Sequence, residues 1–380
     1  TWDPSGAPGV YKLIEKMLIE KENIEIIFTC KNYIGKIKKS KIVNIRGVEK
    51  KLYFAPFYKL FKNHKLNNYF TEIIHLYLIL RRVKNFRPEL IYIDNANIFA
   101  GAFLSRFIRK KVLLRLMGVY PFMKKCIRLK GLKNYYLRWC YSSPYYASIS
   151  VLDGSGGMDF MKKALNKETI KKLVINGVDE GRIINNKKKY ITVLFIGKFE
   201  DYKGIMIFIK TAIKIIKNKP NKFKFILVGK GSRSTLVRNM IKKENISSSV
   251  NIFEQKKHKE ILKIYNKADI YVSLNMYGNL SNTNIEAIKM GKCVIMPSSN
   301  EQDFIDIDTD VLIPKGSVIR IDRNNLETEL YKKLIFLNNN PIVIQSKKNN
   351  ARKLAKNIFW NWDDRINWEL GMLKVLTKNN

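Results

Sequence analysis

The sequence predicts an α/β protein with two doubly wound domains, and three observations support this fold class. The chain has 380 residues, which is too long for one ordinary domain. Hydrophobic residues make up 46% of it, enough to give each domain a core. Short β-rich runs alternate with segments of helical periodicity, a pattern typical of parallel sheets with right-handed crossovers.

The alternation is clearest in the second half. We predict strands at residues 191–196, 223–228, 250–253, 270–274 and 293–296, and helices at 205–217, 234–243, 259–267 and 284–290. Glycines follow the first two of these strands. The carboxyl ends of strands are where open α/β sheets bind ligands.

The first half shows a similar but less regular pattern. We predict helices at 10–21, 69–84 and 98–108, and strands at 24–29, 90–93, 112–116 and 147–151. The segment 173–189 becomes rich in Asn and Lys toward its end, which is typical of a linker. The domain boundary is therefore predicted near residue 174.

The charge is strongly positive. Lys and Arg number 71 against 32 Asp and Glu, a net charge of +39. An AT-rich genome would produce such a bias, because Lys, Ile and Asn are all abundant here. The other interpretation is an anionic partner, which would be a nucleic acid, a phosphorylated ligand or an acidic membrane surface.

One segment concentrates this charge, because no Asp or Glu occurs between Asp94 and Asp153. Its basic residues are Arg106, Arg109, Lys110, Lys111, Arg115, Lys124, Lys125, Arg128, Lys130, Lys133 and Arg138, and aromatic residues lie among them. A solvated face over buried aromatics, a membrane or lipid-acceptor surface and a nucleic-acid surface all remain open. No RNA-binding or zinc-finger pattern supports the last.

Several classes of chemistry are disfavoured. The four cysteines have no CxxC spacing and there are only three histidines, so we expect no zinc site and no Ser-His-Asp nucleophile. No apolar run approaches the roughly 20 residues that a membrane-spanning helix needs. We expect a reducing compartment, and the opening Thr1–Pro4, without Met, suggests a truncated start.

The loop Gly197–Gly204 is a candidate anion site. It follows a predicted strand, precedes a predicted helix and contains Lys198 and Lys203. Backbone N–H groups, a helix N-terminus and Lys side chains together suit a diphosphate. A capped surface turn is the alternative. Gly229 and Gly231 repeat the design one βα unit later, where a tight turn is the simpler explanation.

A second polar loop, Tyr277–Thr283, opens the helix predicted at 284–290. Its amide groups suit a phosphate, and Glu286 near the helix start suits the hydroxyls of a ribose. An N-capped helix with an exposed Glu is the alternative.

Together these motifs resemble glycosyltransferase family 4, whose members are retaining nucleotide-sugar enzymes with the GT-B fold. The ordered set that carries the resemblance is Asn176–Asp179, Gly197–Gly204, Gly229-x-Gly231, Ile252–Ile261, Ala268–Ile270 and Glu286-Ala287-x4-Lys292. Asp3–Val10 also resembles the glycine loop near the family's N-terminus. Trp360–Leu370 resembles the C-terminal helix that crosses back to the first domain.

The resemblance implies two Rossmann-like domains that face a cleft. Residues 1–174 would be the acceptor-side domain, 175–356 the nucleotide-sugar domain and 357–380 the returning helix. The family's first strand normally precedes the glycine loop, so we expect that it is missing from this sequence.

The resemblance also implies roles for single residues. Lys198 and Lys203 would neutralise the leaving diphosphate, and Glu286 would bind the ribose. The other donor-binding residues would be Gly6, Gly197, Gly229, Gly231, Asn279, Leu280, Ser281, Asn282 and Thr283. Neither a metal nor another cofactor would be required. On the acceptor or membrane side we name Arg115, Lys124 and Lys125.

Three positions depart from the family pattern. The first Glu of the family's carboxylate pair aligns with Gly278, the usual first-domain His with Met117 and a usual Gly near the base with Glu254. One branch of the family has an Asn-x-Ser-Asn loop instead of that first Glu, and Asn279–Asn282 resembles this branch.

We therefore expect a retaining transferase that moves a sugar from a UDP or GDP donor to a lipid-linked or phosphorylated saccharide, in the synthesis of a bacterial surface polysaccharide or lipopolysaccharide. It would lie in the cytoplasm, on the inner face of the plasma membrane, without specific nucleic-acid binding. The alternatives are a catalytically degenerate GT-B protein that binds nucleotide or an anionic polymer, and nucleic-acid binding by charge alone.

Overall fold

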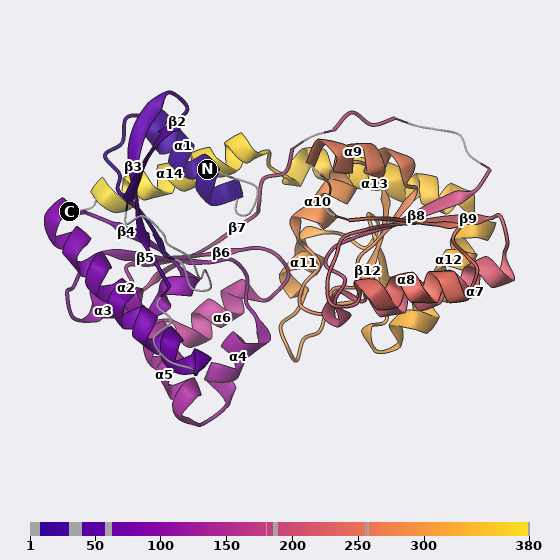
Figure 1. Cartoon of the computed structure of the whole chain (residues 1–380). Coiled ribbons are helices and arrows are strands. Elements are labelled where there is room, and N and C mark those ends of the chain that lie inside the picture. The colour runs from indigo at the N-terminus through magenta and orange to yellow at the C-terminus, as the bar shows by residue number, and fades with distance from the viewer. Residues whose placement is uncertain are drawn as a thin grey trace. The chain divides into compact units, whose positions relative to one another are not determined.

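The structure is a computed structural model that describes residues 8–29, 40–57, 63–179, 181–184, 189–254, 256 and 258–378. Its chain forms two compact units (Figure 1). The first comprises Thr1–Val151, Gly157–Asn176 and Trp362–Asn380, and the second comprises Leu152–Gly156 and Gly177–Asn361. Both contain parallel sheets covered by helices, so the α/β prediction is confirmed.

The main sheet of the first unit has four parallel strands in the order β4-β5-β6-β7. Their bounds are Ile91–Asp94, Val112–Leu116, Ala147–Val151 and Ile170–Val174. Every residue of β5 and β6 is buried. Strands covered on both faces often carry continuous apolar runs, as β5 does apart from Arg115, whereas β6 alternates Ser with apolar residues.

A second sheet of this unit has the order β1-β3-β2, with bounds Ile26–Thr29, Val48–Ala55 and Ser40–Ile45. The β2–β3 hairpin was not predicted from the sequence. Its two turn residues, Arg46 and Gly47, have φ of 52° and 87°. Positive φ at both positions suits a two-residue hairpin turn, so Arg-Gly between two β-rich runs was the signal.

The helices of the first unit are α1 (Pro8–Ile19), α2 (His64–Phe86), α3 (Ile98–Arg106), α4 (Pro121–Arg128), α5 (Leu132–Tyr141), α6 (Gly157–Ala164) and α14 (Trp362–Lys378), with a short 3₁₀ turn η1 (Asn95–Asn97). Helices α4 and α5 were not predicted. The C-terminal helix α14 packs against α1, so the end of the chain belongs to the first unit.

The second unit has one parallel sheet of six strands in the order β10-β9-β8-β11-β12-β13. In that order the bounds are Val250–Phe253, Phe223–Val228, Ile191–Ile196, Ile270–Val272, Cys293–Pro297 and Ile319–Ile321. The chain runs from β8 outward to β10 and then returns to β11 on the other side of β8. The gap between β8 and β11 is therefore the topological switch point, where such sheets bind ligands.

The helices of this unit are α7 (Ile205–Asn218), α8 (Ser234–Lys243), α9 (His258–Lys267), α10 (Asn282–Lys289), α11 (Ile307–Leu312), α12 (Leu326–Asn339) and α13 (Pro341–Ile358), with 3₁₀ turns η2 (Asp201–Lys203) and η3 (Arg323–Asn325). Figure 1 shows α9, α10 and α13 on one face of the sheet and α7 and α8 on the other.

The predicted linker at 173–189 is partly wrong, because Leu173 and Val174 complete strand β7. The Asn and Gly that follow the strand indicated the start of a loop. The strand itself gave little signal because its residues are only partly buried. Residues 180 and 185–188 lie outside the described part. Within the described ranges, no helix combines the length and apolar character needed to cross a membrane.

Candidate functional site

Two loops of the second unit meet beside the switch point, one after β8 and one after β11. The backbone N–H of Met276 donates to the carbonyl oxygen of Tyr202 at 2.9 Å. The rings of Tyr202 and Tyr277 stack with centroids 5.2 Å apart and an interplanar angle of 14°. The two candidate loops from the sequence analysis are thus held together as one surface.

The first loop presents both predicted lysines. Lys198 is exposed, whereas Lys203 is partly buried. Burial lowers the pKa of Lys203, the nearby Asp153 opposes this effect and Lys198 adds to it. Among the described residues, no hydrogen bond or ion pair involves the Lys203 ammonium. Two close cations, one of them partly desolvated, form a strong binding position for an anion.

Gly204 places this lysine at the start of α7. Its φ is 74°, and a Cβ atom there would lie 2.4 Å from the Cβ atom of Leu274. Only glycine allows both the left-handed backbone and this close contact.

Gly229 and Gly231 support the lysine loop from behind. A Cβ atom on Gly229 would lie 1.8 Å from the carbonyl oxygen of Gly197, and one on Gly231 would lie 2.6 Å from that of Phe199. The Gly229 N–H donates to the carbonyl oxygen of Phe253 and the Gly231 N–H to the hydroxyl of Ser234, both at 2.9 Å. Their amides thus already have acceptors, and the donor-binding role expected of these two glycines stays a prediction.

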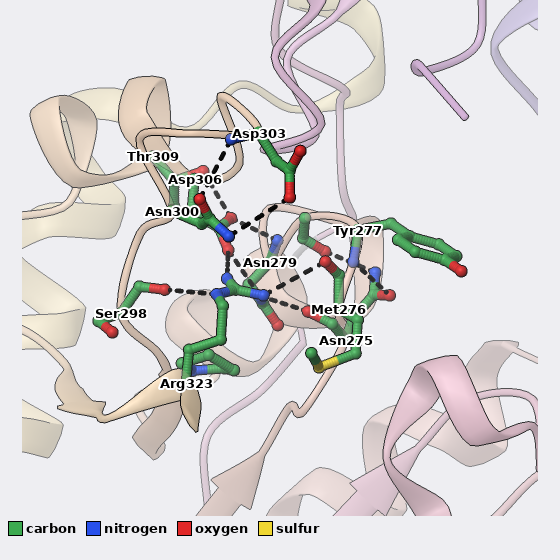
Figure 2. Close-up of polar contacts among 12 residues, drawn as sticks. Asn275, Met276, Tyr277, Asn279, Ser298, Asn300, Asp303, Asp306, Thr309 and Arg323 are labelled. Atoms are coloured by element: carbon green, nitrogen blue, oxygen red, sulfur yellow. Dashed lines mark hydrogen bonds and ion pairs between the residues drawn. The ribbon is translucent and has the colours of Figure 1, made fainter. Parts of the chain in front are cut away.

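A buried carboxylate anchors the second loop. Asp306 accepts the backbone N–H of Asn279 at 2.6 Å, the Asn279 side-chain amide at 2.7 Å and the Arg323 guanidinium at 2.8 Å. The same guanidinium donates to the carbonyl oxygens of Ser298 at 2.9 Å and Met276 at 3.2 Å. Figure 2 shows Asn279 and Arg323 converging on the carboxylate of Asp306. This network fixes the path of the chain into α10.

Asn279 and Leu280 are consequently not free to bind a donor. Both are fully buried, and the Leu280 N–H donates to the carbonyl oxygen of Asp153 at 3.0 Å. The expectation that they offer amides to a diphosphate is corrected. The sequence showed a polar loop but not the Asp306 carboxylate and the Asp153 carbonyl that accept the N–H groups of Asn279 and Leu280.

The first turn of α10, at Ser281, Asn282 and Thr283, is partly exposed. Ser281 is the N-cap residue, but its side chain makes no capping hydrogen bond and instead bonds Asn284 at 2.8 Å. The first N–H groups of a helix lack intrahelical acceptors and carry partial positive charge. This turn is therefore suited to an anion.

Glu286 lies one turn further along α10 and is only 7% exposed. Burial raises the pKa of its carboxyl to about 7, with Tyr265 opposing and Asp179 reinforcing the effect. The Tyr265 hydroxyl donates to it at 3.3 Å. His258 bridges the two acids, with Nδ1 3.7 Å from Glu286 and Nε2 3.6 Å from Asp179. The alternative of an exposed Glu is thus wrong.

A third carboxylate, Asp153, was not identified in the sequence. It lies in the segment Leu152–Gly156, which packs with the second unit, and burial raises its pKa to about 6. Gly278 has a φ of 137°, and a Cβ atom there would lie 2.6 Å from the carbonyl oxygen of Asp153. No side chain fits at 278 in this arrangement. A glycine-flanked Asp after a buried strand was the available signal.

Of the first-unit candidates, Arg115 differs from expectation. It is only 2% exposed, and its Nη1 donates to the Tyr92 hydroxyl at 2.7 Å and lies 3.6 Å from the carboxylate of Glu369. Its charge is therefore neutralised inside the first unit and is not exposed to an acceptor. Lys125 is exposed and Lys124 partly buried, both on α4. Gly6 lies outside the described residues.

The residues that the structure describes contain no group of three or more His, Cys, Asp or Glu side chains arranged to hold a metal ion.

A family model covers the part of the chain that holds the candidate site. Residues 179–310 match the family model of glycosyl transferases group 1. No curated protein matches the sequence. The matched range contains both loops and Glu286.

Solved structures show the same fold at low sequence identity. Sucrose-phosphate synthase from Thermosynechococcus elongatus has a TM-score of 0.74 at 13% identity, covering 98% of this chain and 93% of its own. A glycosyltransferase from Rickettsia africae has a TM-score of 0.69 at 15% identity, with 98% and 95% covered. Anabaena HepE, solved with UDP and glucose, has a TM-score of 0.62 at 13% identity, with 85% and 86% covered. The chain thus has the GT-B fold, with two Rossmann-like domains.

Proposed function

We propose that this chain is a retaining glycosyltransferase of family 4 that uses a nucleoside diphosphate sugar. One observation carries the proposal. At the switch point of the second unit, the Lys203 ammonium has no anionic partner among the described hydrogen bonds and ion pairs, and its loop is bonded to the loop that opens α10. A diphosphate is a dianionic group of the size that such a site suits.

Each group has a distinct task in this proposal. Lys198 and Lys203 neutralise the diphosphate as the bond from the sugar C1 to the phosphate oxygen breaks, and the first turn of α10 adds its N–H groups. Glu286 accepts hydrogen bonds from the ribose hydroxyls. The lysines supply the positive charge that a metal would otherwise provide, so the proposed reaction requires none. Retention at the anomeric carbon follows from the family resemblance.

The acceptor is proposed to be a lipid-linked or phosphorylated saccharide in surface polysaccharide or lipopolysaccharide synthesis, at the cytoplasmic membrane face. The basic and aromatic segment 95–152 supports this part. UDP is the first donor nucleotide to test, because HepE and the pneumococcal O-GlcNAc transferase GtfA were both solved with UDP.

A second candidate function is a catalytically degenerate protein that binds nucleotide without transfer. The observation in its favour is Gly278, whose position has no room for a carboxylate. Slow hydrolysis of the donor separates the two, because an active transferase hydrolyses its donor in the absence of acceptor and a degenerate protein does not. Binding by charge alone would instead fall steeply with salt.

Calorimetry at fixed salt tests the proposal, with UDP, GDP, ADP and CMP as ligands. We expect selective binding of one diphosphate, weakened in Lys203→Ala and Glu286→Ala. Lys219→Ala, an exposed lysine at the far end of α7, serves as the control. Equal, weak binding of all four nucleotides that salt abolishes and neither substitution changes would refute the nucleotide site.

A further inference from the structure

Helix α2 of the first unit has an apolar outer face. Leu66, Tyr69, Ile73 and Tyr77 are each more than half exposed. Their spacing of three and four residues places them in one stripe along the helix. Leu76 and Ile79 of α2 are buried and belong to the core of the unit. An amphipathic helix needs only one apolar face to pack on its own domain, and this outer stripe is a second apolar face.

The neighbouring helix α5 continues this surface. Leu132 is 91% exposed and Tyr135 is 67% exposed. The two helices are in contact, because the rings of Tyr69 and Tyr136 meet edge to face with centroids 6.5 Å apart. The Tyr136 hydroxyl also donates to Glu72 at 2.9 Å. Figure 1 shows α2, α3 and α5 together on one side of the unit. We call Leu66, Tyr69, Ile73, Tyr77, Leu132 and Tyr135 the apolar patch.

The charge beside the patch has a single sign. Lys125, Arg128 and Lys130 are exposed on α4 and in the connection to α5. No acidic residue occurs from 95 to 152, and the one acidic residue of α2, Glu72, accepts a hydrogen bond from Tyr136. We call these three bases the basic rim.

These two features select one kind of partner. An apolar surface with a basic rim complements a bilayer that contains anionic lipids, since alkyl chains meet the apolar side chains and headgroups meet the bases. Tyrosine suits the boundary between them because its ring is apolar and its hydroxyl is polar. A second copy of this chain fits less well, because pairing two patches would bring two basic rims together.

We propose that the apolar patch on α2 and α5, with its basic rim, binds the surface of an anionic lipid bilayer. The helices lie on the bilayer and do not cross it. This surface extends the proposed function and rests on it for its biological purpose. It identifies the side of the first unit that meets a lipid-linked acceptor. The binding itself requires neither donor nor acceptor.

Vesicle co-sedimentation of the full chain tests the proposal, with phosphatidylcholine vesicles that contain or lack phosphatidylglycerol. We expect binding only to the anionic vesicles. The variant Ile73→Ser/Tyr77→Ser/Leu132→Ser/Tyr135→Ser should lose at least about tenfold in partition coefficient, because four apolar side chains leave the interface. Lys125→Glu/Arg128→Glu/Lys130→Glu should lose about as much, because three charges are reversed.

The matched control is Val311→Ser/Ile342→Ser, two strongly exposed apolar residues of the second unit. It should bind vesicles as the wild type does. All variants should bind nucleotide equally, which shows that they are folded.

Three results would overturn the proposal. One is no binding to anionic vesicles. Another is binding that salt abolishes and the serine variant leaves unchanged, which would indicate charge alone. The third is a wild-type dimer that the serine variant converts to monomer, which would make the patch an interface between copies. Loss of nucleotide selectivity with intact vesicle binding would refute only the proposed function.

Discussion

Glu286→Gln tests the electrostatic design of the site. The carboxylate of Glu286 is buried in α10, and burial raises its pKa from an ordinary 4.5 to about 7. The folded state therefore binds this proton more tightly than the unfolded state. Stability falls as the pH rises from 4.5 to 7, and the cost of ionisation is complete above pH 7.

The magnitude follows from the pKa difference. At about 1.36 kcal/mol per pH unit, the ionised carboxylate costs the fold about 3 kcal/mol. Glutamine has the same shape as the protonated acid and still accepts the Tyr265 hydroxyl. We therefore expect Glu286→Gln to be more stable than the wild type by up to about 3 kcal/mol at pH 8 and equally stable at pH 4.5.

Urea unfolding of the full chain at pH 4.5 and pH 8, followed by circular dichroism, measures this difference. Hydrogen exchange of strands β8 to β13 assigns the change to the second unit. Glu301→Gln, on an exposed turn, is the control and should change the free energy of unfolding by less than about 0.5 kcal/mol at either pH. The same Glu286→Gln variant should bind nucleotide about tenfold more weakly, because a charge-assisted hydrogen bond is replaced.

The stability result would refute the reasoning if the difference between variant and wild type were the same at both pH values. A variant less stable at pH 8 would show that the ionised carboxylate contributes to the fold and does not weaken it.

Three other substitutions test the packing and charge of the site. Lys203→Met should weaken nucleotide binding at least tenfold, because the partly buried ammonium is lost and its aliphatic stem is kept. Calorimetry would measure the affinity, and thermal unfolding would show that the chain stays folded. Unchanged affinity would exclude Lys203 from the site. Gly278→Ala should cost at least about 2 kcal/mol in thermal unfolding, because the backbone is left-handed and Asp153 is in the way; a neutral effect would mean that the loop moves aside. Arg323→Met should cost about 3–5 kcal/mol, because it leaves the buried Asp306 without its cation, and adding Asp306→Asn should recover part of the loss in a double-mutant cycle. Additive costs in that cycle would show that the two side chains are not coupled.

Much of the local structure could be predicted from the sequence alone. Strands β5, β8 and β9 are mostly apolar runs between turn signals, and their burial on both faces produces that pattern directly. The β2–β3 hairpin and β7 were missed because their strands are partly exposed, so Lys residues interrupt the apolar pattern. In β7, the sequence of a partly buried edge strand was mistaken for that of a loop.

The site itself was only partly predictable. The glycine and lysine motifs and Glu286 each lie in or next to the loop that holds them. Their order along the sequence was therefore enough to identify them. Which amide is occupied and which is free depends on partners from distant segments. Asn279 bonds Asp306, and Leu280 bonds Asp153, more than a hundred residues away in sequence.

Arg115 shows the same limit. Its position at a strand end suggested an anionic acceptor, yet it pairs with Glu369 on the C-terminal helix. The sequence by itself determined the alternation of strands and helices and the residues that can carry charge at the site. The tertiary structure alone decided which of those charges are already paired, because burial and neutralisation of a side chain depend on segments that only folding brings together.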